Sequence, residues 1–321
     1  MKIGSKASNS QSKFTNEDLK TMQSWDLDRK IAVSLTKIAE FHAKYPHEIY
    51  VSFSGGKDST VLLHLVRRLF PNTPAVFIDT GLEYPELRDF VKTIDNVVRI
   101  KPSMNFRRVI ETYGYPIIGK EQAAFIQEYR TTKSDKLKHI RWHGNKYGRG
   151  KISEKWKFLV NAPFKISDKC CDVMKKKPAI KFEKETGMKP IIGTMAKESA
   201  QRKSNWIRYG CNAFDGDRPS SRPLSFWTEQ DVLQYIQRFN LEYASVYGDI
   251  VQDENGKYCT TKCDRTGCIF CCFGIAQDKE PNRFQRLKET HPKLWNYCMK
   301  PWNEGGLGMR EVLGFIGVKI E

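Results

Sequence analysis

The sequence predicts an α/β fold in which a parallel sheet carries helices on both of its faces. Short apolar runs at 49–51, 74–78 and 97–100 indicate strands, and the composition of 74–78 is typical of a buried parallel strand. Segments with helical spacing of apolar residues separate these runs, and such alternation builds parallel sheets. A glycine-rich turn follows the first run. Because ligands of parallel sheets bind at the carboxyl ends of strands, we expect the functional site at this edge.

The predicted elements alternate along the chain. They are a helical stretch over 15–44, strand 49–51, helix 60–68, strand 74–78, helix 86–92, strand 97–100, strand 189–194, helix 228–236 and helices at 282–288 and 294–298. Thr228 with Asp231 three residues later indicates a helix start. Pro219–Pro223 is interpreted as a linker. Glycines near residue 306 indicate a turn before a last short helix.

The turn at Ser52–Thr60 has the strand, glycine turn and helix arrangement that binds phosphate. Two adjacent glycines allow the backbone to approach an anion, and unpaired amides at the helix start can hold it. The spacing is too short for a Walker motif. The predicted phosphate ligands are Ser52, Ser54, Gly55, Gly56, Lys57, Asp58 and Ser59. The alternative is a glycine turn with a solvent-exposed lysine.

Further candidate residues follow two later strands. Asp79, Thr80 and Gly81 come directly after a predicted strand, where the Asp79 carboxylate could meet Mg²⁺ or a ribose. Asp58 is predicted to cap its helix or to hold Mg²⁺. Glu198 and Arg202 follow strand 189–194 and are expected to line the same cleft; an ordinary surface ion pair is the alternative. The predicted catalytic set is Lys57, Asp58, Asp79, Glu198 and Arg202.

The length of 321 residues allows one large or two modest domains. We expect a tail and leading helix at 1–25, an α/β domain at 26–215 with a basic insertion at 130–157, and a mostly helical, cysteine-containing region at 216–321. The sequence has no run of eighteen apolar residues, and Met1–Lys13 lacks an apolar leader. We therefore expect a cytoplasmic protein with no membrane span.

The formal net charge of +17 favours a polyanionic partner, nucleic acid first among them. Basic residues crowd 130–157, which also contains Trp142, Tyr147 and Trp156. Cations follow a phosphate backbone, and aromatic rings stack on unpaired bases. The alternative is a solvated insertion whose aromatic rings cover a local core.

Nine cysteines without a secretion signal indicate metal or redox chemistry rather than disulfides. Four thiolates suit an iron–sulfur cluster or a structural zinc. Two sets of four arise: Cys170, Cys171, Cys268 and Cys271, or the local set Cys259, Cys263, Cys268 and Cys271. Spacing alone slightly favours the local set, because close cysteines need less ordering of the chain to meet. Cys211 and Cys298 are predicted to be buried thiols.

Six stretches resemble a known family when they are taken in order. They are S-G-G-K-D-S at 54–59, D-T-G-L-E-Y-P-E at 79–86, C-C-D-V-M-K-K-K-P at 170–178, G-T-M-A-K-E-S-A-Q-R at 193–202, R-P-L-S-F-W at 222–227 and G-C-I-F-C at 267–271. The first resembles the PP-loop of ATP pyrophosphatases. The set, from about residue 30 to 275, resembles the phosphoadenosine phosphosulfate (PAPS) reductase family of the adenine nucleotide α-hydrolase superfamily.

The resemblance implies a Rossmann-like fold that binds ATP, or adenylylsulfate (APS) or PAPS, with Mg²⁺. It also favours Cys170, Cys171, Cys268 and Cys271 as ligands of a [4Fe–4S] cluster, because adenylylsulfate reductases hold their cluster with such a pattern; zinc is the alternative. Three departures argue against simple sulfonucleotide reduction. No cysteine follows Cys298, Met195 stands where many relatives have arginine, and the PP-loop is intact.

These departures make the chain more similar to members from phages and mobile elements and to DNA phosphorothioation proteins. The resemblance thus implies ATP-driven activation coupled to sulfur transfer, on nucleic acid and with a sulfur donor protein as a further partner. Two alternatives remain open. One is a sulfonucleotide reductase that uses an external thiol, and the other is a nucleic-acid-binding module without turnover. A small subunit of ATP sulfurylase would share the loop but would not need these cysteines.

Overall fold

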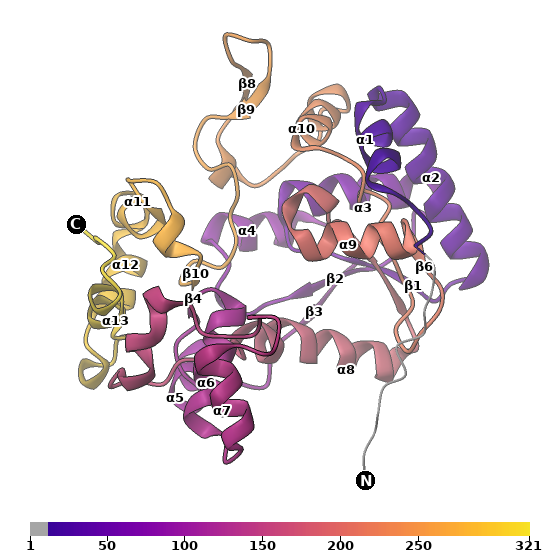
Figure 1. Cartoon of the computed structure of the whole chain (residues 1–321). Helices are drawn as coiled ribbons and strands as arrows, with labels where there is room; N and C mark the ends of the chain where they lie inside the picture. Colours follow the sequence, from indigo (N-terminus) through magenta and orange to yellow (C-terminus); the bar gives the residue numbers. More distant parts are fainter. Residues whose placement is uncertain (1–11) are drawn as a thin grey trace. The chain divides into compact units, whose positions relative to one another are not determined.

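The computed structural model describes residues 12–321, so the predicted tail at Met1–Lys13 lies almost wholly outside the described residues. The chain divides into two compact units. The first contains the described residues up to Ile78 together with Tyr84–Ile100 and Ile180–Thr266. The second contains Asp79–Glu83, Lys101–Ala179 and Gly267–Glu321. Figure 1 colours the segments by their place in the sequence.

The first unit is built on a six-stranded sheet with the strand order β3-β2-β1-β5-β7-β6. Its strands are β1 (Ile49–Ser52), β2 (Ala75–Ile78), β3 (Val97–Ile100), β5 (Lys189–Ile192), β6 (Asn212–Ala213) and β7 (Ser220–Ser221). β1 pairs in parallel with β2 on one side and β5 on the other, and only the β6–β7 pair is antiparallel. The predicted α/β class with a parallel sheet is confirmed.

The helices of the first unit include those predicted at 60–68, 86–92 and 228–236 and one at 200–209 that was not predicted. The helices are α1 (Asn16–Ser24), α2 (Leu27–Lys44), α3 (Lys57–Leu69), α4 (Pro85–Thr93), α9 (Ala200–Tyr209), α10 (Glu229–Arg238) and the short 3₁₀ turns Ala196–Glu198 and Ser245–Tyr247. The helical stretch predicted at 15–44 contains two helices. Asp26 accepts a hydrogen bond from the Arg29 amide at 2.8 Å, and this cap starts the second helix. α3 contacts α2, α10 and β1 (Figure 1).

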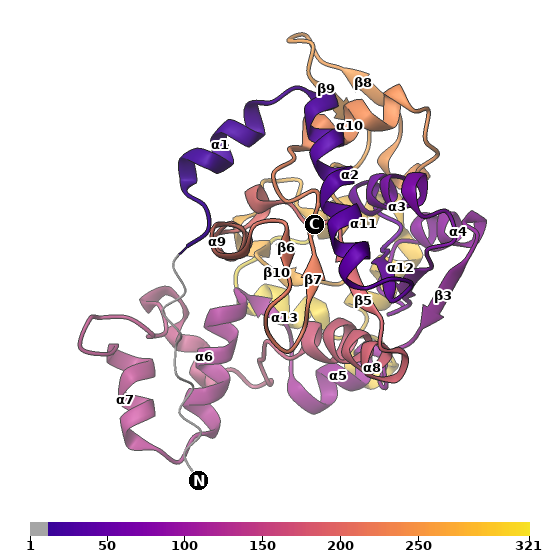
Figure 2. The ribbon, with the colours of Figure 1, turned by 90° about the vertical axis from the view of Figure 1, so that its right-hand side faces the viewer.

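A small hairpin completes the first unit. Strand β8 (Ile250–Gln252) pairs antiparallel with β9 (Tyr258–Thr260). Figure 2 shows this hairpin beside α10, where the Gln230 side chain donates to the carbonyl of Tyr258 at 2.7 Å. The hairpin leads into residues 261–266, which lie next to the predicted phosphate turn.

The interpretation of Pro219–Pro223 as a linker is wrong. Ser220 and Ser221 form β7, with Ser221 paired to Ile191 of β5 and to Asn212 of β6. Both serines are buried, and the Ser221 hydroxyl donates to Asn212 Oδ1 at 2.7 Å. A strand of two polar residues has no hydrophobic pattern, so its pairing with β5 is a tertiary effect.

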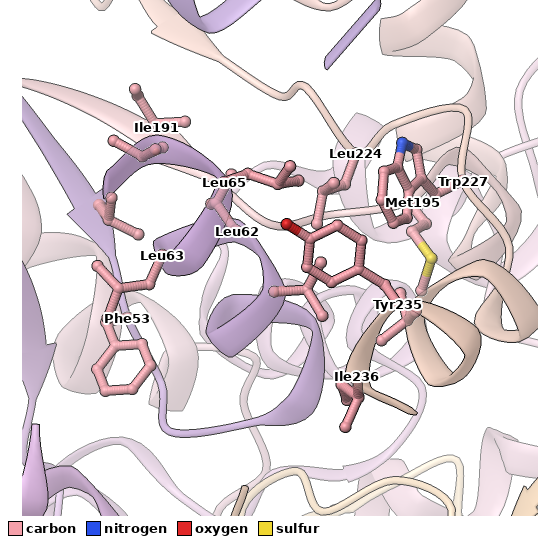
Figure 3. Packing of buried hydrophobic residues seen from close by; sticks show 14 of the residues in the cluster. Phe53, Leu62, Leu63, Leu65, Ile191, Met195, Leu224, Trp227, Tyr235 and Ile236 are labelled. Atoms are coloured by element: carbon pink, nitrogen blue, oxygen red, sulfur yellow. The ribbon is translucent and has the colours of Figure 1, made fainter. Parts of the chain in front are cut away.

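The core of the first unit lies around α3. Leu62, Trp227 and Tyr235 are essentially inaccessible to solvent, and Figure 3 shows these side chains packed together. The Trp227 indole donates to the Ser34 hydroxyl at 2.9 Å, which in turn donates to the Pro223 carbonyl. The R-P-L-S-F-W stretch therefore contributes core packing that holds α10 and α2 beside α3.

A buried ion pair links α2 to α10. Lys30 is 2% exposed, and its ammonium donates to both carboxylate oxygens of Asp231 at 2.8 and 2.7 Å and to the carbonyl of Gln23. Asp231 also accepts from the Thr228 amide at the start of α10, as the sequence predicted.

Replacing Lys30 with methionine is expected to lower the free energy of unfolding by about 3–5 kcal/mol, because the Asp231 carboxylate would stay buried without its counter-ion. The control is Lys37→Met, whose pair with Glu40 is partly exposed and is expected to contribute at most about 1 kcal/mol. Urea unfolding followed by circular dichroism measures both. Equal effects of the two substitutions would contradict the role given to the buried pair.

The second unit is mostly helical. Its elements are α5 (Phe106–Tyr113), β4 (Ile117–Ile118), α6 (Lys120–Thr131), α7 (Asp135–His143), the 3₁₀ segments Glu154–Asn161, Ile275–Gln277 and Trp302–Glu304, one π-helical turn at Asp172–Lys176, β10 (Cys272–Phe273), α11 (Arg283–Thr290), α12 (Pro292–Met299) and α13 (Met309–Phe315). α8 (Lys177–Thr186) begins in this unit and ends in the first. β4 and β10 pair in parallel, with Cys272 opposite Ile117.

The units are interleaved in sequence, whereas the domain prediction was sequential. The expected boundary at 215/216 falls inside the first unit, and the basic insertion 130–157 belongs to the second. Within residues 12–321, no helix is both long enough and apolar enough to cross a bilayer.

Candidate functional site

The predicted phosphate turn joins β1 to the start of α3. Gly55 has φ +75°, and an added Cβ would lie 2.8 Å from Val91 Cγ2 and 3.2 Å from the Leu87 carbonyl oxygen. Any other residue there would be strained and would collide with α4. Gly55 is thus required by the backbone conformation and by close packing under α4.

The amides at the start of α3 face hydroxyl groups. The Gly56 amide donates to Ser54 Oγ at 3.3 Å, and the Lys57 amide donates to Tyr247 Oη at 3.4 Å. The Ser54 and Ser59 hydroxyls lie 3.1 Å apart. Gly56 is the N-cap and provides no side-chain cap, so these amides at the positive end of the α3 dipole donate to neutral hydroxyl groups. A phosphate oxygen would be a stronger acceptor at the same amides.

Tyr247 comes from the 3₁₀ turn that follows α10, and sequence reasoning did not identify it. Burial raises the pKa of Tyr247 to about 12, so its hydroxyl stays protonated at neutral pH and can both donate and accept. It lies 3.2 Å from the Thr266 hydroxyl. No local motif marks this tyrosine, because only the fold brings it to the turn.

Lys57 was predicted to be a phosphate ligand, and its side chain is 4% exposed. Its ammonium pairs with Glu229 Oε1 at 2.7 Å, donates to the Asp264 carbonyl and lies 5.2 Å from the centre of the Tyr247 ring. This charge is thus held beside the α3 N-terminus by α10 and by the segment after β9. Nucleotide phosphates would take the place of Glu229 as its counter-ion.

Asp58 lies in the first turn of α3, and its Oδ1 atom is buried without a hydrogen-bond partner among the described residues. Burial raises the pKa of Asp58, against the opposing effects of Lys57, Arg265 and, more weakly, Arg202. A buried carboxylate oxygen without a donor beside a cationic phosphate site is a suitable ligand for Mg²⁺, which prefers carboxylate oxygens.

Glu198 and Arg202 are brought together, and a second arginine joins them. The Glu198 carboxylate accepts hydrogen bonds from the Met195 amide at 2.7 Å and from both Arg202 and Arg265. The Glu198 side chain is only 11% exposed, whereas the side chains of Arg202 and Arg265 are 42% and 57% exposed. Arg202 and Arg265 are both close enough to affect Asp58. The predicted residues Lys57, Asp58, Glu198 and Arg202 thus lie in one region of the first unit, together with Tyr247, Glu229 and Arg265, which the sequence did not indicate.

Replacing Asp58 with asparagine is expected to stabilise the protein at neutral pH by about 0.5–2 kcal/mol, because it removes a charge that burial disfavours. The pKa of Asp58 is higher in the folded than in the unfolded state. The destabilisation of the wild type by the charged Asp58 is therefore complete above the folded-state pKa and disappears below about pH 3.9. Urea unfolding at pH 7 and at low pH measures the difference, and Mg²⁺-dependent ATP binding should weaken. The control is the exposed Asp28→Asn. A destabilised Asp58→Asn protein would contradict the assignment.

Asp79, Thr80 and Gly81 belong to the second unit. The Thr80 amide and hydroxyl donate to the two Glu83 carboxylate oxygens at 3.1 and 2.6 Å. The Leu82 carbonyl accepts from the Ile269 amide at 2.8 Å. This segment is therefore a tight turn, anchored next to the second half of the cysteine motif.

The cysteines Cys170, Cys171, Cys268 and Cys271 all lie in the second unit. Burial is the main cause that raises the pKa of Cys170, and the other three thiols raise it further. Burial likewise raises the pKa values of Cys268 and Cys271. The four thiols are thus near neighbours, and a bound metal would be needed to keep them as thiolates. Among residues 12–321, no three Cys, His, Asp or Glu side chains are arranged closely enough to hold a metal ion together. The donor set fits an iron–sulfur cluster by its chemistry.

Lys175 and Glu83 also belong to this group, although no role was predicted for them from the sequence. A π-helical turn begins after Cys171 and contains Lys175. Burial lowers the pKa of Lys175, but a hydrogen bond with Cys268 and the charges of Cys268, Glu83 and Cys171 outweigh burial and raise it. A buried ammonium beside thiolates stabilises their negative charge. The alternative set also uses Cys259 and Cys263, which are half-buried residues of the first unit, so it spans both units.

Cys211 and Cys298 are buried, as the sequence predicted.

Fold and site together define the class: an α/β protein with a glycine turn after a central parallel strand in its first unit and four cysteines in its second. The model of the phosphoadenosine phosphosulfate reductase domain matches residues 48–272. The chain therefore belongs to the PAPS reductase family, as its motifs implied.

Individual relatives are distant. An uncharacterized protein of Methanocaldococcus jannaschii is 25% identical over 293 residues, which are 89% of this chain and 55% of the relative. The chain thus spans about half the length of this relative. The adenosine 5'-phosphosulfate reductase of Geobacillus kaustophilus is 25% identical over 221 residues, covering 68% of this chain and 76% of that protein. The solved PAPS reductase of Candida auris has a TM-score of 0.39 and 14% identity, covering 76% of this chain and 98% of that one.

Proposed function

We propose that the first unit binds ATP with Mg²⁺ and uses it to activate an acceptor oxygen for replacement by sulfur. The observation that carries the proposal is the Lys57–Asp58 pair at the start of α3. It joins a buried ammonium, amides without a strong acceptor and a carboxylate oxygen without a donor. These three features match the anionic oxygens and the cation of a magnesium–triphosphate.

In the proposed reaction, an acceptor oxygen attacks the α-phosphorus, the bond to the bridging β-phosphate oxygen breaks, and pyrophosphate leaves. The charge that develops on the pyrophosphate would be neutralised by Lys57 and Mg²⁺. Arg202 and Arg265 lie close enough to Asp58 to affect its pKa. Sulfide from an external donor then attacks the acceptor atom that bears the adenylylated oxygen. AMP departs with that oxygen, and sulfur takes its place.

The proposed cofactor of the second unit is a [4Fe–4S] cluster held by Cys170, Cys171, Cys268 and Cys271, with zinc as the alternative metal. A cluster of this type supplies reversible one-electron chemistry. Lys175 would stabilise the thiolate charge through its contact with Cys268.

The proposed acceptor is nucleic acid. The support is the net charge of +17 and the ten Lys and Arg residues against two acidic residues within 130–157.

The test is an incubation with ATP, Mg²⁺, nucleic acid and sulfide, followed by measurement of pyrophosphate and AMP. Release of both that depends on nucleic acid is the expected result. Salt-sensitive binding of nucleic acid without pyrophosphate would instead indicate a binding module without turnover, and would end the proposal.

A second candidate is reduction of a sulfonucleotide with an external thiol. Its support is the family and the 25% identity to adenosine 5'-phosphosulfate reductases. Anaerobic release of sulfite from adenylylsulfate or PAPS, with thioredoxin or glutathione as reductant, would favour this candidate. Absence of sulfite with either donor would remove it.

A further inference from the structure

We infer that the loop at residues 144–150 is a stacking platform that binds an unpaired base of a nucleic acid through Tyr147. This loop follows α7, which Figure 2 shows beside α6 in the second unit. The inference rests on the proposed function only in taking the bound strand to be the acceptor. Binding itself needs no ATP chemistry.

The aromatic residues of the basic insertion have different roles. Trp142 lies 5.3 Å from the Tyr129 ring, and the Lys157 ammonium covers it at 4.6 Å. Trp156 is half-buried and lies 6.3 Å from Phe158. These two residues are engaged in local packing, which is what the alternative interpretation of the insertion expected. Tyr147, in contrast, is 71% exposed, and its ring contacts only the Lys146 ammonium among the described ring and cation–π contacts.

The backbone of the loop is fixed by its own hydrogen bonds. Asn145 Oδ1 accepts from the amides of Tyr147 and Arg149 at 2.9 and 3.0 Å. The Asn145 amide donates to the Arg149 carbonyl, and the Gly148 amide donates to the Asn145 carbonyl, both at 2.8 Å. An exposed aromatic ring on an ordered loop binds a flat partner with little loss of conformational entropy.

Both ends of the loop are held by hydrogen bonds. The Gly144 amide donates to the Ile140 carbonyl at 2.8 Å and ends α7. The Arg141 guanidinium donates to the Gly150 carbonyl at 2.7 Å, pairs with Glu128 and covers the Phe125 ring at 4.1 Å. Arg141 therefore stabilises the loop and is not available as a phosphate ligand.

The surroundings of Tyr147 are cationic. Lys146 and Arg149 flank it in the loop and are exposed, and α7 has no buried residue along its length. The further exposed cations of the insertion are Arg130, Lys133, Lys136, Lys138, Lys151 and Lys155. The charge complements a phosphate backbone, and the exposed ring complements a base that is not paired. A membrane surface would instead require a row of exposed apolar side chains on α7, which this helix lacks over its described length.

The test measures binding of fluorescently labelled oligonucleotides to the full chain without ATP. The probes are rU12, dT12 and a blunt RNA duplex, and comparison of the first two distinguishes RNA from DNA as the source of the strand. Tyr147→Ala is expected to weaken binding of at least one single strand by about tenfold or more, and to leave duplex binding within about twofold. Tyr147→Phe keeps the ring and should bind like the wild type.

A matched charge variant separates stacking from electrostatics. Lys146→Gln should weaken single strand and duplex alike and reduce the salt slope by about one. The inference is overturned if Tyr147→Ala binds both single strands like the wild type, if Tyr147→Phe loses as much affinity as the alanine variant, or if phosphatidylserine vesicles bind more tightly than the oligonucleotides. The ATP affinity of Tyr147→Ala, measured by calorimetry with Mg²⁺ and without nucleic acid, should equal that of the wild type and reports separately on the proposed ATP site.

Discussion

Lys57→Ala is expected to lower ATP-dependent pyrophosphate release by about 10²–10³-fold, the usual loss when one donor to a developing oxyanion is removed. The ammonium is buried at the start of α3, where charges interact more strongly than in bulk water. Water in the place of the side chain would therefore not restore the stabilisation of the transition state. Pyrophosphate release under saturating ATP and nucleic acid measures the effect on the chemical step. ATP affinity, measured separately by calorimetry, should also fall.

Two comparisons make this result specific. Lys92→Ala removes the same charge from an exposed pair on α4 and should release pyrophosphate at the wild-type rate. Glu229→Gln removes the counter-ion of Lys57 while leaving the lysine in place, so ATP should bind more tightly to this variant. If Lys57→Ala keeps wild-type turnover, the turn after β1 is not the site of α-phosphate chemistry.

Cys171→Ser is expected to remove essentially all of the iron and acid-labile sulfide from an anaerobic preparation. Its thiol lies close enough to Cys170 and Cys271 to raise the pKa of both within the second unit, and a hydroxyl is a poor ligand for iron in such a cluster. Because metal binding adds to folding free energy, the variant should also unfold at a lower temperature. Iron, zinc and sulfide contents are measured on the same samples.

Cys259→Ser is the matched control, since Cys259 belongs only to the alternative local set. It should keep the iron that Cys171→Ser loses. The opposite pattern, with metal lost from Cys259→Ser and kept by Cys171→Ser, would assign the local set instead. Zinc in a colourless wild-type preparation would show that the site holds a structural zinc and not an iron–sulfur cluster.

Local sequence patterns predicted the parts of the fold that depend on short-range chemistry. The strand at β1, the glycine turn and α3 are coded within about twenty residues, and Thr228 defines a helix start through a contact three residues away. The cap at Asp26, which divides the stretch 15–44 into two helices, was not predicted. β7 could not be predicted in this way. Ser220 and Ser221 have no strand pattern, and their burial comes from pairing with β5 and β6.

The sequence by itself determined the family, the parallel sheet, the glycine turn after β1 and the cysteines whose thiolates can bind metal. These follow from the spacing of residues along the chain and from side-chain chemistry, and neither depends on the conformation of the chain. Only the tertiary structure placed Tyr247, Glu229 and Arg265 around the start of α3, gathered Cys170 with Cys268, and separated the exposed Tyr147 from the packed Trp142. Those contacts join residues far apart in the chain, and their selection depends on the burial of the whole core, which no short stretch encodes.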